Sequence, residues 1–222
     1  MTHPAPDPDG LRADVATAAR RLADAGLLVG TAGNVSARAG DLVAITATGV
    51  ALGECTADEV TVVTLGGDVV AGSLAPTSEL ALHLGGYADF PAAAIVHTHA
   101  PFATAVACVL DALPVLHYQQ LALGGEIRVA PYATFGTDEL AAHVRATLQG
   151  RSAALLANHG SVTLGATLDA AVENALLLEW LCQLHHRASA LGTPRVLTDE
   201  QQADVVRAAI ERGYGTPRKA TE

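Results

Sequence analysis

The sequence predicts an α/β protein in which helices cover a sheet. Two kinds of pattern are mixed throughout the chain: apolar residues at helical spacing, and short apolar runs that end at glycine, proline or polar residues. The chain has 222 residues, of which 50% are hydrophobic, and this is enough for one large packed domain. No internal repeat or linker divides it. We therefore expect a single domain over residues 1–222.

The N-terminal third begins with a proline-rich segment, residues 1–8, which we expect to be flexible together with residues 215–222. A helix is predicted from about residue 9 to Gly26, a residue type that commonly ends helices. Its apolar positions are Leu11, Val15, Ala18 and Leu22.

Two glycine-containing segments follow this helix, GTAGNVS at residues 30–36 and TATG at residues 46–49. Small residues allow a backbone to approach a ligand closely, and successive N–H groups can bind an anion. Ordinary hairpin turns have the same composition, so both interpretations remain open.

Residues 60–71 predict two strands around the turn Gly66-Gly67-Asp68. Pro76, Thr77 and Ser78 then predict a helix start, with Glu79 in the first turn. A carboxylate there is favoured by the helix dipole, so Glu79 is either a helix-start charge or a functional group.

The stretch AIVHTHAP, residues 94–101, predicts a short buried strand. On a strand His97 and His99 lie on the same face, roughly 6.6 Å apart along the chain, and can converge on one ion. Zinc usually takes three or four protein ligands, so the other ligands must come from elsewhere. Glu79 and His159, in ALLANHGSV, are the candidates. A set of ordinary buried histidines is the alternative, and the strand-end positions favour the metal.

The remaining elements alternate between helices and strands. We expect a helix at residues 102–112, strand-like pieces near His117 and at residues 127–129, and a helix that begins at Thr137 and Asp138 and ends near Gly150. A short strand at residues 151–158, a long helix at 168–191 and a last helix at 198–213 complete the prediction.

Charge and cysteine content limit the partners and the compartment. The net charge of −10 argues against nucleic acid or an anionic membrane surface as a partner, and the single lysine, Lys219, lies in the tail. Cys55, Cys108 and Cys182 are odd in number, and we expect each to be a reduced, small, buried side chain. No apolar stretch reaches the roughly 20 residues needed to span a bilayer. These features indicate a cytoplasmic protein.

Several short motifs together resemble the class II aldolase/adducin family, and within it most closely the L-fuculose-1-phosphate aldolases. They are, in order, GTAGNVS, TATG, PTSE, HTHAP, HYQQLALGG, PYATFGT and NHG. The resemblance covers about residues 9–215. It implies three layers, α/β/α, around a central mixed, largely antiparallel sheet. It also implies a homotetramer whose active sites are shared between neighbouring subunits.

The resemblance assigns roles to individual residues. It implies zinc ligands at His97, His99 and His159, and a catalytic carboxylate at Glu79 that can also touch the metal. A second group would bind the phosphate of a sugar phosphate: Thr31, Gly33, Asn34, Thr48, Gly49, Thr77 and Ser78. It further implies that Tyr118, from the neighbouring subunit, and Tyr214 act on the aldehyde half, and that Phe135 lines the aldehyde pocket. Interface packing is the alternative for both tyrosines.

The implied reaction is the reversible cleavage of a ketose 1-phosphate, of the L-fuculose 1-phosphate type, to dihydroxyacetone phosphate and an aldehyde such as L-lactaldehyde. Zinc, or another divalent metal, would stabilise an enediolate, and Glu79 would transfer a proton. A pentulose-5-phosphate 4-epimerase and a 5-deoxypentulose-1-phosphate aldolase are alternatives within the family. Family epimerases have an aspartate in the region of HYQQLALGG, where this chain has none. A non-catalytic adducin-like scaffold is disfavoured, because the histidines and Glu79 are all present.

Overall fold

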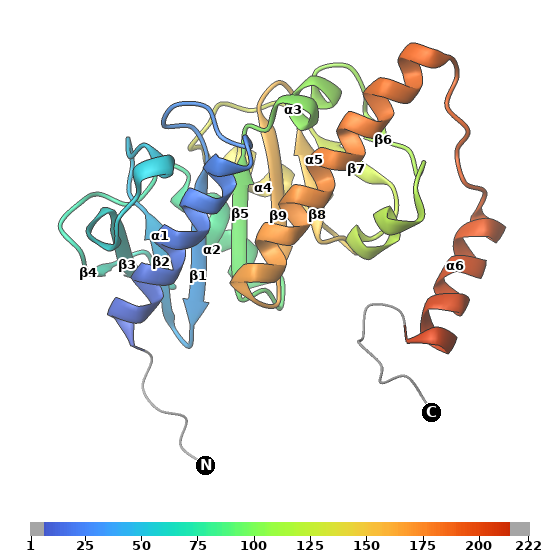
Figure 1. The fold of residues 1–222 in the computed structure, drawn as a ribbon. Helices are drawn as coiled ribbons and strands as arrows, with labels where there is room; N and C mark the ends of the chain where they lie inside the picture. The colour runs from blue at the N-terminus through green and yellow to red at the C-terminus, as the bar shows by residue number, and fades with distance from the viewer. Residues whose placement is uncertain (1–6, 214–222) are drawn as a thin grey trace.

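One nine-stranded sheet lies between two layers of helices in the computed structural model, which describes residues 7–213 (Figure 1). The strand order is β4-β3-β2-β1-β5-β9-β8-β7-β6. Only the β7–β8 pair is parallel, so the predicted mixed, largely antiparallel sheet is confirmed. The strands are β1 (Asn34–Ala39), β2 (Leu42–Thr46), β3 (Val60–Thr64), β4 (Val69–Ala71), β5 (Ala94–Thr98), β6 (Ala112–Leu113), β7 (Ile127–Ala130), β8 (Ala153–Leu156) and β9 (Gly160–Gly165).

The helices divide between the two faces of the sheet. They are α1 (Pro8–Asp24), α2 (Leu80–Asp89), α3 (Pro101–Ala107), α4 (Asp138–Thr147), α5 (Leu168–Leu191) and α6 (Asp199–Arg212), with short 3₁₀ helices η1 (Leu52–Glu54), η2 (Ala57–Glu59) and η3 (Tyr118–Leu123). Helices α1, α3 and α5 share one apolar core with the sheet, and α2 and α4 share the other. The sheet contributes to both cores because side chains alternate along a strand. On β5, Val96 belongs to the first core and Ile95 to the second.

Most predicted elements lie where the sequence indicated. The long helix α5 matches its predicted bounds, and α6 follows the N-cap Thr198 and ends at Gly213, which has a left-handed backbone. The first helix begins earlier than expected, because Asp7 caps it and Pro8 occupies its first turn. The last two residues of the segment that we expect to be flexible, Asp7 and Pro8, therefore belong to the start of this helix. No helix within residues 7–213 has the length and apolar character needed to cross a membrane.

The strand predicted near His117 is wrong. His117 itself is extended, but its Nδ1 accepts a hydrogen bond from the Gln119 N–H and the chain continues as η3. The strand of this region lies earlier, at β6. A local capping interaction therefore overrides the β-propensity of the sequence.

The cysteines are all free thiols, as predicted. Cys55 and Cys182 are buried, but Cys108 is exposed, which corrects the expectation that all three are buried. Cys108 is the C-cap residue of the short helix α3, where the chain turns away from the sheet.

Candidate active site

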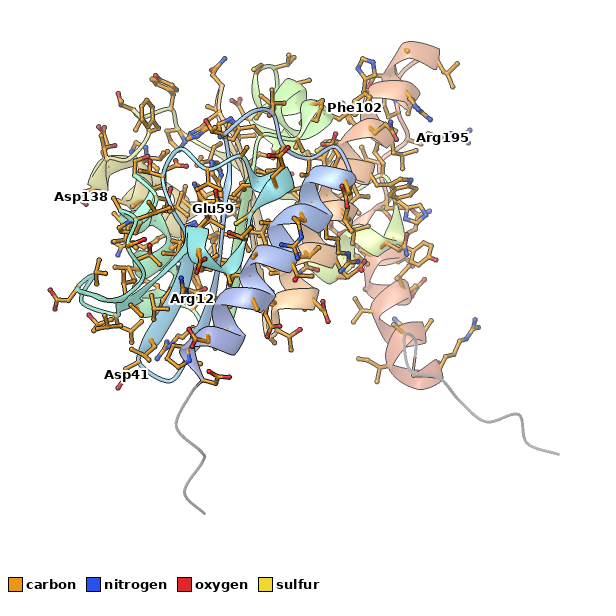
Figure 2. All side chains as sticks on the ribbon, turned by 60° about the vertical axis from the view of Figure 1, so that its left-hand side comes forward. Arg12, Asp41, Glu59, Phe102, Asp138 and Arg195 are labelled. Atoms are coloured by element: carbon orange, nitrogen blue, oxygen red, sulfur yellow. The ribbon has the colours of Figure 1, made fainter. Side chains whose placement is uncertain are left out.

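Four side chains from separate elements converge at one end of the sheet. His97 lies near the end of β5, His99 just beyond it, His159 in the turn between β8 and β9, and Glu79 immediately before α2. This end is the one from which α3 leaves β5, marked in Figure 2 by Phe102, whereas Asp41 marks the β1–β2 turn at the opposite end. We predicted these four residues as candidate metal ligands from the sequence, and in the structure they lie in one cluster.

The turn that carries His159 depends on special backbone positions. Asn158 is the only non-glycine residue with positive φ among residues 7–213, at 55°. A Cβ atom on Gly160 would collide with the backbone oxygen of Thr98. The sequence Asn-His-Gly therefore lets β9 approach β5 closely and turns His159 toward His97.

The ligand atoms of the four residues lie within 4.8 Å of one another. His97 Nε2 lies 3.0 Å from His99 Nε2 and 3.1 Å from Glu79 Oε2. Glu79 Oε1 lies 3.6 Å from His159 Nε2. One atom can therefore contact all four groups.

The orientation of His97 fits a metal at this point. Its Nδ1 lies 2.9 Å from the Ser161 carbonyl oxygen, which can only accept, so the ring proton sits on Nδ1. Nε2 then faces Glu79 Oε2 at 3.1 Å, so a divalent metal between these two atoms would contact both residues. Glu79 Oε1 is also buried without a hydrogen-bond partner in the described part of the chain. Three imidazoles and a carboxylate are a donor set that zinc and other divalent metals take.

Burial and neighbouring charges set the protonation of the cluster. Burial, followed by the charge of His97, lowers the pKa of His99 and of His159 to about 4, so both rings are neutral at pH 7. Burial opposes ionisation of Glu79, but the charge and hydrogen bond of His97 and the Asn34 hydrogen bond outweigh it and lower its pKa well below the ordinary value. At neutral pH His99 and His159 are therefore neutral and Glu79 is ionised, which are the forms that bind a metal.

The structure corrects the predicted position of Glu79 in its helix. Helix α2 begins at Leu80, so Glu79 is the N-cap residue rather than a first-turn residue, and its side chain does not cap the helix. The carboxylate points to the histidines instead. The carboxylate therefore lies at the helix start without capping it, and its contacts are with the histidines and Asn34.

A pocket of about 490 Å³ opens above the cluster. It contains Glu79, His99 and His159, while His97 lies beneath them, fully buried. All seven residues predicted to bind phosphate line the same pocket: Thr31, Gly33, Asn34, Thr48, Gly49, Thr77 and Ser78. Phe135 lies there as well, with an exposed side chain. Asn158 and Tyr132 also line it, although the sequence had given no reason to choose them.

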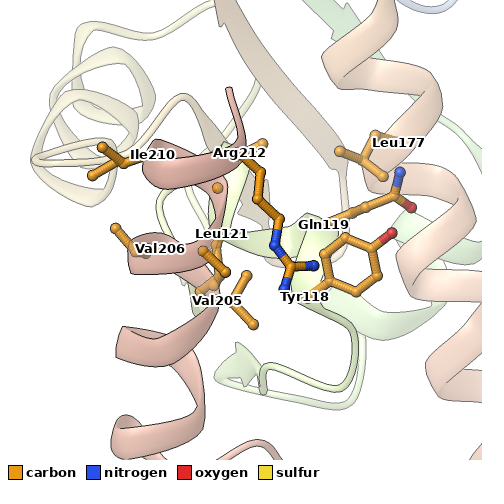
Figure 3. A pocket seen from close by; sticks show the side chains of 11 residues that line it. Tyr118, Gln119, Leu121, Leu177, Val205, Val206, Ile210 and Arg212 are labelled. Carbon is orange, nitrogen blue, oxygen red and sulfur yellow. The ribbon is translucent and has the colours of Figure 1, made fainter. Parts of the chain in front are cut away.

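Of the two predicted tyrosines, the one that the structure describes, Tyr118, does not line this pocket. Tyr214 falls outside the described residues. Tyr118 lines a second, largely apolar pocket of about 470 Å³ between η3, α5 and α6. Figure 3 shows its ring near the guanidinium of Arg212 on α6, with Gln119 on the side of Leu177. Any contact between Tyr118 and the substrate would therefore need a neighbouring subunit.

Known proteins are similar to this chain over most of its length. Residues 13–186 match the model of the class II aldolase and adducin N-terminal domain. The chain belongs to this family. A 5-methylthioribulose-1-phosphate/5-deoxyribulose-1-phosphate aldolase of Rhodospirillum rubrum is 38% identical over 198 residues, 88% of this chain and 89% of the relative. The L-fuculose phosphate aldolase of Escherichia coli is 41% identical over 184 residues, 82% and 85% of the two chains.

A solved structure of an L-fuculose 1-phosphate aldolase superposes on this class II aldolase with a TM-score of 0.86. The two chains are 33% identical, and the match covers 94% of this chain and 99% of the other. The predicted three-layer fold is therefore confirmed. The predicted enzyme class is confirmed too, because aldolases are lyases.

Proposed function

We propose that this class II aldolase uses zinc, or another divalent metal, to cleave a ketose 1-phosphate reversibly into dihydroxyacetone phosphate and an aldehyde. One observation carries the proposal. The histidine and carboxylate cluster and the glycine- and hydroxyl-rich loops line the same pocket, so a metal and a phosphate would bind one small molecule together. The aldolases among its relatives act on phosphorylated ketoses, as their names state.

The phosphate would be held without a cationic side chain. In the described part of the chain, neither lysine nor arginine lines this pocket. Backbone N–H groups near Gly33 and Gly49, together with the hydroxyls of Thr48 and Ser78, are the donors available for a phosphate. Thr77 Oγ1 already accepts hydrogen bonds from Asn34 Nδ2 and the Glu79 N–H, so it also fixes these neighbours.

The chemistry follows from the surroundings of Glu79. When a divalent metal is bound by the three histidines, it supplies Lewis-acid stabilisation of the negative charge that develops on the substrate oxygens. Glu79 is ionised at neutral pH and its Oε1 has no hydrogen-bond partner among residues 7–213, so this oxygen can accept the proton from the carbon next to the ketone. In the cleavage direction the same oxygen returns the proton.

The aldehyde half of the substrate would lie toward the rim of the pocket. Phe135 and Tyr132 provide exposed aromatic surface there. We propose that Tyr118 of a neighbouring subunit completes this side in a homotetramer, with Tyr214 as the weaker candidate. The relatives leave two kinds of aldehyde open: L-lactaldehyde from L-fuculose 1-phosphate, and the aldehyde from a 5-deoxypentulose 1-phosphate. The three free thiols support our proposal of a reducing, cytoplasmic location.

The decisive experiment measures the release of dihydroxyacetone phosphate by zinc-loaded protein from L-fuculose 1-phosphate and from 5-deoxyribulose 1-phosphate. A chelated sample is the control. Release that disappears with the chelator and returns with zinc supports the proposal, and the ratio of kcat/KM values then identifies the aldehyde. No release from either sugar, combined with interconversion of pentulose 5-phosphates, would replace the aldolase with the epimerase.

A further inference from the structure

A chain of buried polar side chains leads from Glu79 into the interior of the protein. It passes through Asn34, His83 and Ser36 to Tyr87, and each of these side chains is at most 6% exposed. Asn34 and Ser36 are two residues apart on β1, so they lie on the same face of the strand. Glu79, the N-cap residue of α2, and His83 and Tyr87 on this helix follow one another at four-residue spacing, and α2 packs on that face of the sheet.

Four short contacts connect these five residues. Asn34 Nδ2 lies 2.9 Å from Glu79 Oε2, and Asn34 Oδ1 lies 2.6 Å from His83 Nε2. Ser36 Oγ lies 2.7 Å from His83 Nδ1 and 2.6 Å from the Tyr87 hydroxyl. Apart from Glu79 Oε1, each buried polar side-chain group of these five residues therefore has a partner, as the cost of burying an unpaired group requires.

The chemistry of the two ends gives these bonds a single direction. Asn34 Nδ2 donates to Glu79 Oε2, so Oδ1 of the same amide, which can only accept, takes its hydrogen bond from His83 Nε2–H. Burial, followed by the charge of His97, lowers the pKa of His83 to about 3, so the ring carries a single proton. His83 Nδ1 is then an acceptor, the Ser36 hydroxyl donates to it, and the Tyr87 hydroxyl donates to Ser36.

The opposite orientation of the Asn34 amide would place Oδ1 against the Glu79 carboxylate. Two acceptors would then face each other at a buried site, and the amide N–H₂ would face the Nε2–H of His83. His83 with its proton on Nε2 adds to this preference, because its N–H pairs with Oδ1 and would face the amide N–H₂ after the rotation. His83 therefore holds the Asn34 amide from the side opposite Glu79. With Nε2–H donated to Asn34, Nδ1 accepts from the Ser36 hydroxyl, and this bond supports the same tautomer.

We propose that His83 is a positioning residue for Glu79. By donating Nε2–H to Asn34 Oδ1, it holds the amide N–H on Glu79 Oε2 and leaves Oε1 directed at the metal-ligand cluster and the pocket. The consequence for catalysis depends on the proposed function. The consequence for metal binding does not, because Glu79 belongs to the cluster in either case.

The test compares two variants of His83. In His83→Leu the donor is lost at similar size, and we expect zinc affinity of the whole protein, measured by competition with a chromophoric chelator, to fall about 10- to 100-fold. His83→Gln can present an amide N–H near the position of Nε2, and we expect it to recover most of that affinity. With substrate, kcat should fall in His83→Leu by a larger factor than KM rises, and His83→Gln should restore it. Zinc affinity equal to wild type in His83→Leu would overturn the proposal.

A second measurement keeps the proposal testable if His83→Leu does not fold. Nitrogen-15 NMR of the metal-free protein should show neutral His83 with its proton on Nε2, and Ser36→Ala should give a mixture of the two tautomers and weaker zinc binding. Tyr87→Phe is the matched control, because Ser36 can still donate to His83, and we expect unchanged zinc affinity. A proton on Nδ1 in wild type would overturn the proposal. Absence of aldol cleavage by wild type would overturn only the proposed function, since zinc affinity and tautomer remain measurable.

Discussion

At the scale of single residues, the two oxygens of the Glu79 carboxylate have different surroundings. Oε2 accepts a hydrogen bond from Asn34 and lies beside His97. Oε1 is buried, has no hydrogen-bond partner among residues 7–213 and lies beside His159. One oxygen is therefore fixed by the protein, and the other remains available for a metal ion or a proton.

Replacement of this carboxylate tests its role as a proton carrier. We expect Glu79→Gln to lower kcat by about 10²- to 10⁴-fold, the usual contribution of a positioned acid or base. Zinc should still bind through the three histidines, with lower affinity, because the amide keeps the size of the side chain but not its charge. Turnover and zinc content are measured on the same sample. A Glu79→Gln protein with normal turnover and bound zinc would remove Glu79 from the reaction.

The histidine cluster allows a matched pair of substitutions. His97→Ala should abolish zinc binding and activity while the fold is retained, because the ring lies at the centre of the cluster. His143→Ala is the control, since His143 lies on α4 outside the cluster and contacts the Pro131 carbonyl. Circular dichroism, zinc content and aldehyde release distinguish the two. Full activity of His97→Ala would refute the assignment of the site.

At the scale of elements, the turn that leads into β1 positions both the phosphate side of the pocket and Asn34. Gly33 has φ of 94°, and a Cβ on it would lie 2.6 Å from Leu28 Cδ2 and 2.9 Å from the His97 carbonyl oxygen. Gly30, in the same turn, has φ of 61° but no atom within 4 Å of such a Cβ. Both glycines have a left-handed backbone, but only at Gly33 would an added side chain also collide with neighbouring atoms.

We expect Gly33→Ala and Gly30→Ala to differ in a defined way. Gly30→Ala should lower the free energy of unfolding by about 1–2 kcal/mol, the cost of a left-handed backbone for a residue with a Cβ. Gly33→Ala should cost more and also raise KM, because the added methyl group would push on the backbone that carries His97. Urea unfolding and steady-state kinetics measure both effects. Equal costs for the two variants would contradict a role for close approach at Gly33.

At the scale of the whole molecule, buried imidazoles make the metal-free protein sensitive to acid. The pKa of His83 is about 3 and those of His99 and His159 are about 4, all lowered from 6.5 chiefly by burial. Below pH 6.5 the unfolded chain therefore binds more protons than the folded protein. Their stabilising contribution is fully present above pH 6.5 and is lost as the pH falls toward 3 to 4.

Urea unfolding of chelated protein at pH 7 and pH 5 checks this expectation. The free energy of unfolding should be lower at pH 5. In His83→Gln one of the three titrating groups is absent, so the loss between the two pH values should be smaller. A stability independent of pH over this range would show that these histidines do not stay neutral in the folded protein.

The predicted tetramer is also a property of the whole molecule. Helix α6 lies away from the sheet and contacts η3, and Ile210 and Val206 on it are 77% and 48% exposed in the single chain (Figure 1). Because Tyr118 lies beside this surface, outside the pocket that holds the histidine cluster, a shared site requires assembly. Light scattering should give about four times the 22.6 kDa mass of one chain. A monomeric mass would contradict shared active sites.

The hydrogen-bonded side chains that lead from Glu79 into the interior show which features local sequence patterns can predict. The spacings of Asn34 with Ser36, and of Glu79 with His83 and Tyr87, are visible in the sequence, yet we predicted no role for His83. The periods place each set on one face of its own element. These periods do not predict that this face of β1 contacts this face of α2, because the contact depends on how the helix packs against the sheet.

The sequence by itself determined the α/β class, the bounds of the long helix, and the candidate ligands His97, His99, His159 and Glu79, because periodicity and motifs are local properties. Only the tertiary structure decided that Glu79 precedes its helix and faces the histidines, that His117 begins a 3₁₀ helix, and that Tyr118 lies outside the pocket of its own chain. These features depend on contacts between residues distant in the chain, or on a cap that competes with strand propensity, and local patterns encode neither.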